Sequence, residues 1–166
     1  MMPNVACSIG EGIILLTSLK DFPTSTDEQH MRLALTLSSK LGYTTELSES
    51  VFDAASALAS SSPAFIFIMI EALADGGVLS GLSREMALKL AANAVRGCAQ
   101  LYLKTEKPLG QLKDEVCSPA GTTIAGVRQI EKAGVRSALI EAVFASKHRA
   151  DELAKIAKMS TNHETD

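Results

Sequence analysis

The stretch from Ser83 to Thr105 has too little polar surface for an ordinary surface helix. Its polar residues recur every three or four positions, which places them in one narrow stripe along a helix. They are Glu85, Lys89, Asn93, Arg96, Gln100 and Lys104. Because a surface helix of a monomer keeps about half of its circumference polar, this one must be covered on most sides. Either a partner subunit covers it, or it is the central helix of a monomeric bundle.

The composition is that of a compact protein with a helical core. The 166 residues are 46% hydrophobic but only 4% aromatic, and tryptophan is absent. The core must therefore consist mainly of Ala, Leu, Ile and Val side chains, which favours close packing of helices. A net charge of −3 gives no general attraction to nucleic acid or to an anionic membrane, so neither is an expected partner.

The cysteines and the apolar segments favour a cytoplasmic protein. Cys7, Cys98 and Cys117 are odd in number and show no CxxC spacing, which indicates a reducing compartment and argues against a zinc site, so no metal is expected. No motif places a histidine near Cys117, so a cysteine nucleophile is not favoured. The longest apolar run, Pro63 to Ile70, is too short to span a bilayer. The N-terminus shows no secretory signal.

The local patterns predict mainly helices, with one or two short strands near the N-terminus. Ile13 to Thr17 and Tyr43 to Leu47 are typical of strands. Between them, Thr26-Asp27-Glu28-Gln29 is a capping box for a helix that reaches up to Gly42. Further helices are expected at residues 50–59, 63–76, 83–105, 109–116, 122–133 and 135–159.

A turn between two of these helices has the chemistry of an anion site. Pro119 and Gly121 break the preceding helix, and Thr122 or Thr123 can cap the next one. The first amides of that helix have no intrahelical partners and carry partial positive charge, so a small carboxylate fits in front of them. A Ser-Pro-x-Gly-Thr sequence is also an ordinary way to join two helices, so the turn alone does not establish a site.

Three segments together resemble the pyrroline-5-carboxylate reductase family. They are Gln111 to Glu131 (QLKDEVCSPAGTTIAGVRQIE), Asp53 to Val78 (DAASALASSSPAFIFIMIEALADGGV), and Met2-Pro3-Asn4 followed by Gly10-Glu11-Gly12, in that family's order and spacing. The likeness covers about the first 155 residues and is to the C-terminal part of the family. It implies a mainly α fold, a helical oligomerisation domain with one or two short N-terminal strands, that forms a homodimer or a larger homo-oligomer.

The same resemblance implies how the chain is divided. Residues 1–48 would be a remnant strand–helix–strand segment, residues 49–159 the helical dimerisation and substrate-binding domain, and residues 160–166 a polar tail. The family's Rossmann domain, which binds NADP or NAD through a strand, a GxGxxG turn and a helix, would precede residue 1. Gly10-Glu11-Gly12 is not that turn, because the third glycine is missing and no long helix follows directly. We therefore expect the isolated chain to be inactive.

The resemblance assigns roles in hydride transfer to 1-pyrroline-5-carboxylate, which yields L-proline. The main-chain amides around Gly121, Thr122 and Thr123 would hold the substrate carboxylate, and Ser118 would shape the loop. The Thr123 hydroxyl would bond to the substrate ring and help to place the imine carbon against the nicotinamide. Thr123 could equally be only a helix cap.

Two acidic residues have positions in the same pattern. Glu49 matches a family position that approaches the substrate, where a carboxylate would favour the iminium form. It could equally only complement a helix dipole. Glu115 stands where relatives often carry Asn near the cofactor, and the negative charge of an acid there would oppose a contact with the pyrophosphate.

Several positions depart from the family pattern. Serines at 60 and 62 replace two glycines in a Ser-Gly-Ser-Gly-Pro segment, so the loop expected there must take another path if those glycines supplied a positive φ. Ala120 replaces a glycine in the Ser-Pro-Gly-Gly turn, a change that looks tolerable. These departures leave a divergent imine reductase relative as one alternative to the reductase. The other alternative is a non-catalytic helical oligomerisation or binding domain.

Overall fold

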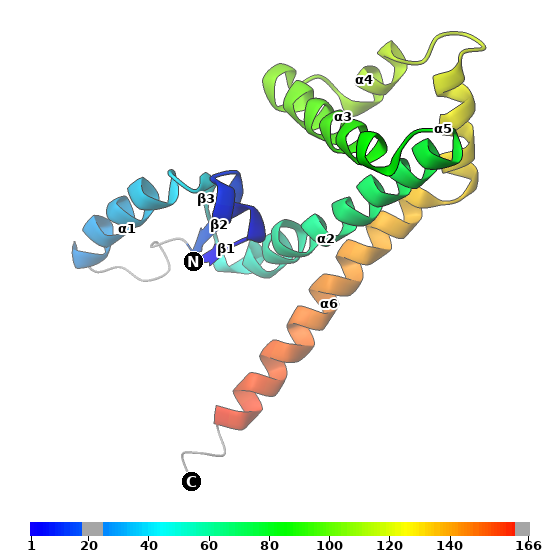
Figure 1. Ribbon diagram of the computed structural model, residues 1–166. Helices are drawn as coiled ribbons and strands as arrows, with labels where there is room; N and C mark the ends of the chain where they lie inside the picture. The colour runs from blue at the N-terminus through cyan, green and yellow to red at the C-terminus, as the bar shows by residue number, and fades with distance from the viewer. Residues whose placement is uncertain (18–24, 162–166) are drawn as a thin grey trace. The chain divides into compact units, whose positions relative to one another are not determined.

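The computed structural model describes residues 1–17 and 25–161 and divides the chain into two compact units. The first unit takes Met1–Pro63 and the chain from Glu141 onward, and the second takes Ala64–Ile140. Figure 1 shows the elements in order. The helices in the described ranges are α1 (Ser25–Ser38), α2 (Glu49–Leu79), α3 (Arg84–Thr105), α4 (Leu109–Glu115), α5 (Thr122–Lys132) and α6 (Val135–Thr161). The predicted mainly α fold, with a small N-terminal sheet and no Rossmann unit in these ranges, is confirmed.

The first unit is built around a three-stranded sheet. β2 (Gly12–Thr17) lies in the middle, antiparallel to β1 (Met2–Pro3) and parallel to β3 (Gly42–Leu47). Parallel strands need a crossover connection, and α1 lies within it. Three consecutive residues of β2 are at most 3% exposed, so both faces of this strand are covered. These residues are Ile14, Leu15 and Leu16.

The two predicted strands are confirmed, each with one more residue at its N-terminal end. β1 was not predicted because two residues are too few to show a period. A 3₁₀ helix, Val5–Ile9, connects β1 to β2. The predicted capping box rests on Thr26, Asp27 and Glu28, whose side chains lie outside the described part of the chain.

β2 and β3 approach each other closely at two glycines. Gly42 has a φ of 139°, in the left-handed region, and a Cβ there would lie 2.1 Å from the main-chain oxygen of Gly12. A Cβ on Gly12 would in turn lie 2.1 Å from Cys7 Sγ. The sheet register pairs Gly12 with Gly42. Because a Cβ at either position would collide with neighbouring atoms, both positions require glycine in this fold.

In the second unit, α2 and α3 meet through small side chains. Ala74 on α2 packs with Ala87 and Ala91 on α3, and all three are at most 7% exposed. A Cβ on Gly77 of α2 would lie 3.1 Å from Ala87 Cβ, which shows how closely the two helices approach. Short side chains at such a contact allow a small interaxial distance.

A glycine turn connects α2 to α3. Gly81 has a φ of 99°, and the amide of Leu82 donates to the Gly77 carbonyl at 3.0 Å, the long-range bond of a Schellman motif. Ser83 then caps α3, because its hydroxyl accepts a hydrogen bond from the Met86 amide at 3.3 Å. The turn therefore satisfies backbone groups at both helix ends.

α2 runs without a break where the sequence predicts two helices and a loop. Residues 60–62 and Pro63 are helical, so the serines at 60 and 62 need no positive φ, and the expected loop does not exist. Ala57 and Ala59 are buried in this segment. Their packing offsets part of the cost of an internal proline, which is about 3 kcal/mol in an unsupported helix.

The sequence suggested that no apolar segment is long enough to span a bilayer, because the run from Pro63 to Ile70 is short. Since α2 is continuous, the apolar helix is longer than that run. In the described part of the chain, α2 is the one helix long and apolar enough to cross a membrane by length and composition. The most apolar 18-residue segment of α2 has a mean hydropathy of 1.7, and 17% of that segment is buried within the chain. Apolar helices of protein cores pass the same test, so length and composition assign no membrane location to α2.

The predicted bounds of α3, α4, α5 and α6 are confirmed to within two residues at each end. α6 extends to Thr161, two residues beyond its predicted end. The predicted polar tail at 160–166 thus begins inside α6, and residues 162–166 lie outside the described ranges.

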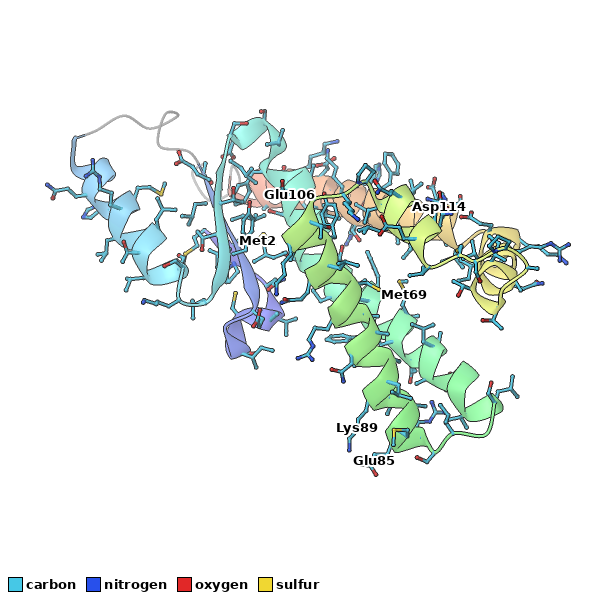
Figure 2. All side chains as sticks on the ribbon, turned by 90° about the horizontal axis from the view of Figure 1, so that it is seen from above. Met2, Met69, Glu85, Lys89, Glu106 and Asp114 are labelled. Carbon is cyan, nitrogen blue, oxygen red and sulfur yellow. The ribbon has the colours of Figure 1, made fainter. Side chains whose placement is uncertain are left out.

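The predicted polar stripe on α3 is confirmed by hydrogen bonds that run along it. Lys89 Nζ donates to Glu85 Oε1 at 2.6 Å, and Asn93 Nδ2 donates to the Lys89 carbonyl at 2.8 Å. Arg96 then donates to Asn93 Oδ1 at 2.8 Å. Figure 2 shows Glu85 and Lys89 next to each other on α3. Because each bond joins residues three or four positions apart, these four side chains share one face.

Replacing Gly42 with alanine should strongly destabilise the first unit. The new Cβ would collide with the Gly12 oxygen at a positive φ, at a combined cost of about 2–4 kcal/mol. Gly126→Ala is the matched control, because Gly126 lies inside α5 with no atom within 4 Å of an added Cβ. That change should stabilise by up to about 1 kcal/mol. Urea unfolding measures both, and equal effects would contradict the close approach of β2 and β3.

Candidate functional site

The turn predicted as an anion site has the features of a type II β-turn. The Gly121 amide donates to the Ser118 carbonyl at 3.0 Å. Pro119 follows Ser118, and Ala120 has a φ of 57°, the left-handed conformation that this turn requires after proline. Alanine adopts this conformation at a cost of about 1 kcal/mol that glycine avoids. The replacement at 120 is therefore accommodated, with some backbone strain.

The helix after the turn begins at Thr122, as predicted, but its N-cap lies earlier in the sequence than expected. Gly121 is the N-cap of α5, in an extended conformation and without a side-chain cap, so the expectation that Thr122 or Thr123 caps the helix is wrong. The reason is the tightness of the turn. A Cβ at 121 would lie 2.3 Å from Ser118 Oγ and 3.1 Å from the Ser118 carbonyl oxygen, so any larger residue would displace the Ser118 side chain. Ser118 thus contributes both its carbonyl and its hydroxyl to the shape of the turn.

Three main-chain amides lie at the open end of α5. The Ala125 amide is the first to donate within the helix, to the Gly121 carbonyl at 3.4 Å. The amides of Thr122, Thr123 and Ile124 precede it and have no intrahelical acceptor. All three residues are exposed. The helix dipole adds partial positive charge at this end, so the three amides can receive an anion.

The corrected N-cap adds Ile124 to the residues named from the sequence. Its amide is the third free donor once Gly121 is the cap. The signal was present in the sequence, because a glycine before two threonines can itself be an N-cap. In the described part of the chain, no group is hydrogen-bonded to the Thr123 hydroxyl, so that hydroxyl remains available beside the amides.

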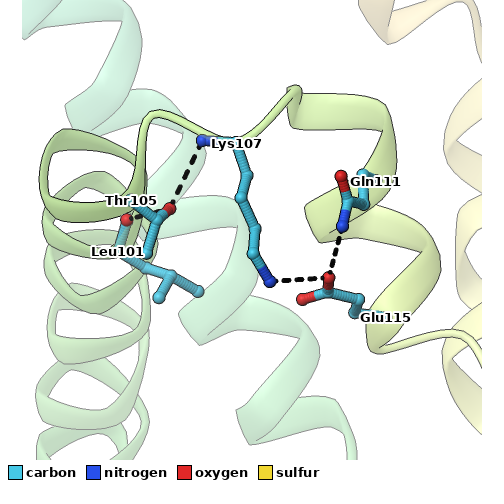
Figure 3. A network of polar contacts seen from close by, with 5 residues as sticks. All are labelled: Leu101, Thr105, Lys107, Gln111 and Glu115. Carbon is cyan, nitrogen blue, oxygen red and sulfur yellow. Dashed lines mark hydrogen bonds and ion pairs between the residues drawn. The ribbon is translucent and has the colours of Figure 1, made fainter.

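Glu115, at the end of α4, is held by two donors of its own chain. Lys107 Nζ and Gln111 Nε2 each lie 2.9 Å from Glu115 Oε1 (Figure 3). The hydrogen bond from Lys107, followed by that from Gln111, lowers the pKa of the Glu115 carboxyl below its ordinary value, so the group is ionised at neutral pH.

The same network fixes the connection between α3 and α4. The Thr105 hydroxyl donates to the Leu101 carbonyl at 2.7 Å and accepts from the Lys107 amide at 3.5 Å (Figure 3). Lys107 therefore links the end of α3 to Glu115 on α4. This gives Glu115 a structural function, and its contact with a cofactor remains a prediction.

Glu49 and the turn belong to different compact units of the chain. Glu49 is the first residue of α2 and is exposed, in the first turn where an acid complements the helix dipole. It belongs to the first unit, whereas the turn from Ser118 to Thr123 belongs to the second. The candidate residues Ser118, Gly121, Thr122 and Thr123 thus lie together in one turn. The approach of Glu49 to a substrate remains a prediction.

Other reactive side chains are scattered. The three cysteines are free. Among the residues that the structure describes, no group of three or more His, Cys, Asp or Glu side chains is placed to hold a metal ion. The candidate anion site consists of main-chain amides and a threonine hydroxyl.

α3 exposes most of its apolar surface. Ala87 and Ala91 are its buried residues, so the chain itself does not cover the helix as a central helix of a monomeric bundle would be covered. At least 40% of each large apolar side chain on the rest of the helix is exposed, apart from Val95. These side chains are Met86, Leu88, Leu90, Leu101, Tyr102 and Leu103.

Replacing Ala120 with glycine should stabilise the second unit. Glycine removes the strain of a positive φ but also raises the conformational entropy of the unfolded chain. We expect the free energy of unfolding to rise by about 0.5–1 kcal/mol in total. Ala125→Gly, inside α5, is the control and should cost about 1 kcal/mol. Thermal unfolding of both variants is the measurement. A loss of stability in Ala120→Gly would contradict the turn geometry.

Comparison with known proteins identifies the family. Residues 49–153 match the pyrroline-5-carboxylate reductase dimerisation family. The chain is 44% identical over 154 residues to the pyrroline-5-carboxylate reductase of Synechocystis, covering 93% of this chain and 56% of that protein. It is 43% identical over 155 residues to the Arabidopsis thaliana enzyme, covering 93% and 55%.

A solved structure has the same fold. The crystal structure of Plasmodium falciparum pyrroline carboxylate reductase with NADP bound matches with a TM-score of 0.80 and 33% identity, over 90% of this chain and 59% of that one. This chain spans about half the length of the curated relatives that it matches. Together, the helical fold, the Ser118–Thr123 turn and these matches show that the chain belongs to the pyrroline-5-carboxylate reductase family and contains its dimerisation domain.

Proposed function

We propose that this chain is the subunit-pairing and substrate-binding part of an NAD(P)H-dependent reductase that converts 1-pyrroline-5-carboxylate to L-proline. The observation that carries the proposal is the set of free amides at Thr122, Thr123 and Ile124, in a chain that matches the family over residues 49–153. A carboxylate is the charged group that this substrate offers, and helix N-terminal amides bind such groups.

The proposed chemistry divides between the substrate's two polar ends. The amides of the turn hold the carboxylate, while the Thr123 hydroxyl hydrogen-bonds to the ring nitrogen. This fixes the ring, so that the imine carbon is presented in one orientation. Glu49 would favour the protonated, electrophilic imine through its negative charge. A nicotinamide dinucleotide, NADPH or NADH, supplies the hydride when it is bound.

The Gly10–Gly12 segment does not have the position of a dinucleotide-binding turn. Gly12 is the first residue of β2, so the Gly10–Gly12 segment precedes a strand, whereas the pyrophosphate-binding turn of a Rossmann unit follows one. Glu115 is ionised and would repel pyrophosphate. We infer that a dinucleotide-binding domain of the kind found in the family holds the cofactor.

The alternatives are a non-catalytic oligomerisation or binding domain and a divergent imine reductase. Two observations favour the reductase. The serines at 60 and 62 lie in a regular helix, so they force no strained loop. Ala120 takes the left-handed conformation that the turn requires, so the amides after it stay in place. The departures from the family pattern therefore do not argue against the proposed anion site.

We further propose that the protein is a cytoplasmic homodimer or larger homo-oligomer. The exposed apolar side chains of α3, including Leu90 and Leu101, form a surface that a second copy would cover. The apolar window of α2 is 17% buried within the chain, so it too has surface to contribute. Burial between subunits would remove both surfaces from water.

Charge on the apolar side of α3 should disrupt assembly. Leu90 and Leu101 are 54% and 49% exposed, so Leu90→Glu with Leu101→Glu would place unpaired charge in the interface without altering the protomer's own core. Gln100→Glu, on the polar stripe, is the matched control. Light scattering at micromolar concentration should give a dimer or larger for the parent and the control, and a monomer or aggregate for the double variant. A monomeric parent would contradict the proposal.

The turn can be tested in a hybrid enzyme. The part of the Synechocystis relative that this chain does not cover would be joined in front of it, and substrate-dependent NAD(P)H oxidation would be measured. Thr123→Val should lower kcat/KM about ten- to a hundredfold, because a hydrogen bond to a charged partner is worth about 1.5–3 kcal/mol.

Two controls accompany this test. Thr36→Val makes the same change at an exposed threonine of α1 and should leave kcat/KM unchanged. The isolated 166-residue chain should oxidise neither NADPH nor NADH. If Thr123→Val in the hybrid kept the parent's kcat/KM, or lost activity only in proportion to folded protein, the turn would be a plain helix connection.

A further inference from the structure

Pro63 interrupts the hydrogen bonding of α2 from within. It lies in the middle of a helix that continues on both sides, and proline has no N–H to donate. The acceptor that loses its partner is the carbonyl four residues earlier, at Ala59. Ala59 is 8% exposed, so water does not readily replace the lost bond. A buried carbonyl without a partner is destabilising, so a substitute donor is required.

The side chain of Asn4 supplies that donor. Asn4 Nδ2 donates to the Ala59 carbonyl at 3.1 Å, across 55 positions of sequence. On its other side, Asn4 Oδ1 accepts from the Ile13 amide at 3.0 Å. The main chain of Asn4 is engaged as well, because its N–H donates to the Ile13 carbonyl and its own carbonyl accepts from the Cys7 amide, both at 3.1 Å.

The two partners also define which way the Asn4 amide points. The Ile13 amide can only donate, and the Ala59 carbonyl can only accept, so Oδ1 must face β2 and Nδ2 must face α2. Aspartate has nearly the same shape and could still accept from Ile13, but it has no donor for Ala59. The demand for a donor and an acceptor on one short side chain is therefore met by asparagine.

We propose that Asn4 is a latch that replaces the helical hydrogen bond missing at Pro63 and ties the N-terminal segment to α2. The Asn4–Ala59 bond stabilises the one turn of α2 that proline leaves incompletely bonded. The boundary between the two compact units falls directly after Pro63, so the latch acts where the first unit ends. When the latch opens, α2 opens at this turn before the rest of the helix does.

A double-mutant cycle on the 166-residue protein tests the latch. Asn4→Asp keeps the acceptor for Ile13 and removes the donor to Ala59, so Tm should fall by about 3–10 °C. Pro63→Ala restores the helical N–H to the Ala59 carbonyl. In the Pro63→Ala background, Asn4→Asp should therefore cost less than half as much. An equal loss of Tm in both backgrounds would overturn the proposal.

Hydrogen exchange gives a second readout and a matched control. Asn4→Asp should speed exchange of the amides around residues 60–66 at least about tenfold, and Pro63→Ala should reverse this. Asn93→Asp removes a similar donor from the Lys89 carbonyl, which keeps its helical partner, so it should leave Tm nearly unchanged. If Asn4→Asp does not fold, the double variant must fold, and its failure to do so contradicts the latch.

Discussion

The close contact between α2 and α3 determines what the rest of this chain can do. Ala74 and Gly77 meet Ala87 and Ala91, and side chains this short allow the helices to approach but bury little area. The large apolar residues of α3 stay outside the contact, with Leu103 70% exposed. Such a surface is unfavourable in water, and covering it with a second subunit removes the cost. The dimerisation family matched by the chain is consistent with this requirement.

The anion site depends on a different constraint, the space between Ser118 and Gly121. The turn is so tight that a side chain at 121 would collide with the Ser118 hydroxyl. The glycine at this position caps α5 without a side-chain acceptor for the first amides. This leaves three donors of the main chain free at an exposed helix end, and a bound carboxylate would take the place of the missing cap. Tight backbone geometry thus creates the proposed site.

Regular segments were predictable from the sequence, and backbone detail was not. The stripe from Glu85 to Lys104 predicted α3 because its period is that of a helix, and Gly81 and Ser83 mark the turn before it. The break expected before Pro63 was wrong. The burial of Ala57 and Ala59 and the hydrogen bond from Asn4 to the Ala59 carbonyl stabilise the helix there against the local preference of proline. The left-handed conformation of Ala120 depends on contacts within the turn that the sequence pattern does not encode, whereas the glycine before two threonines was an available signal for the cap at Gly121.

The direct test of the central claim is to observe the amides of Thr122, Thr123 and Ile124 while a carboxylate ligand is added. L-Proline titrated into ¹⁵N-labelled protein should shift these three amide signals together and with saturation. Prolinamide, which has the same ring without a carboxylate, should leave them in place. Loss of this difference, or saturable shifts that arise elsewhere while these three signals stay fixed, would contradict the account.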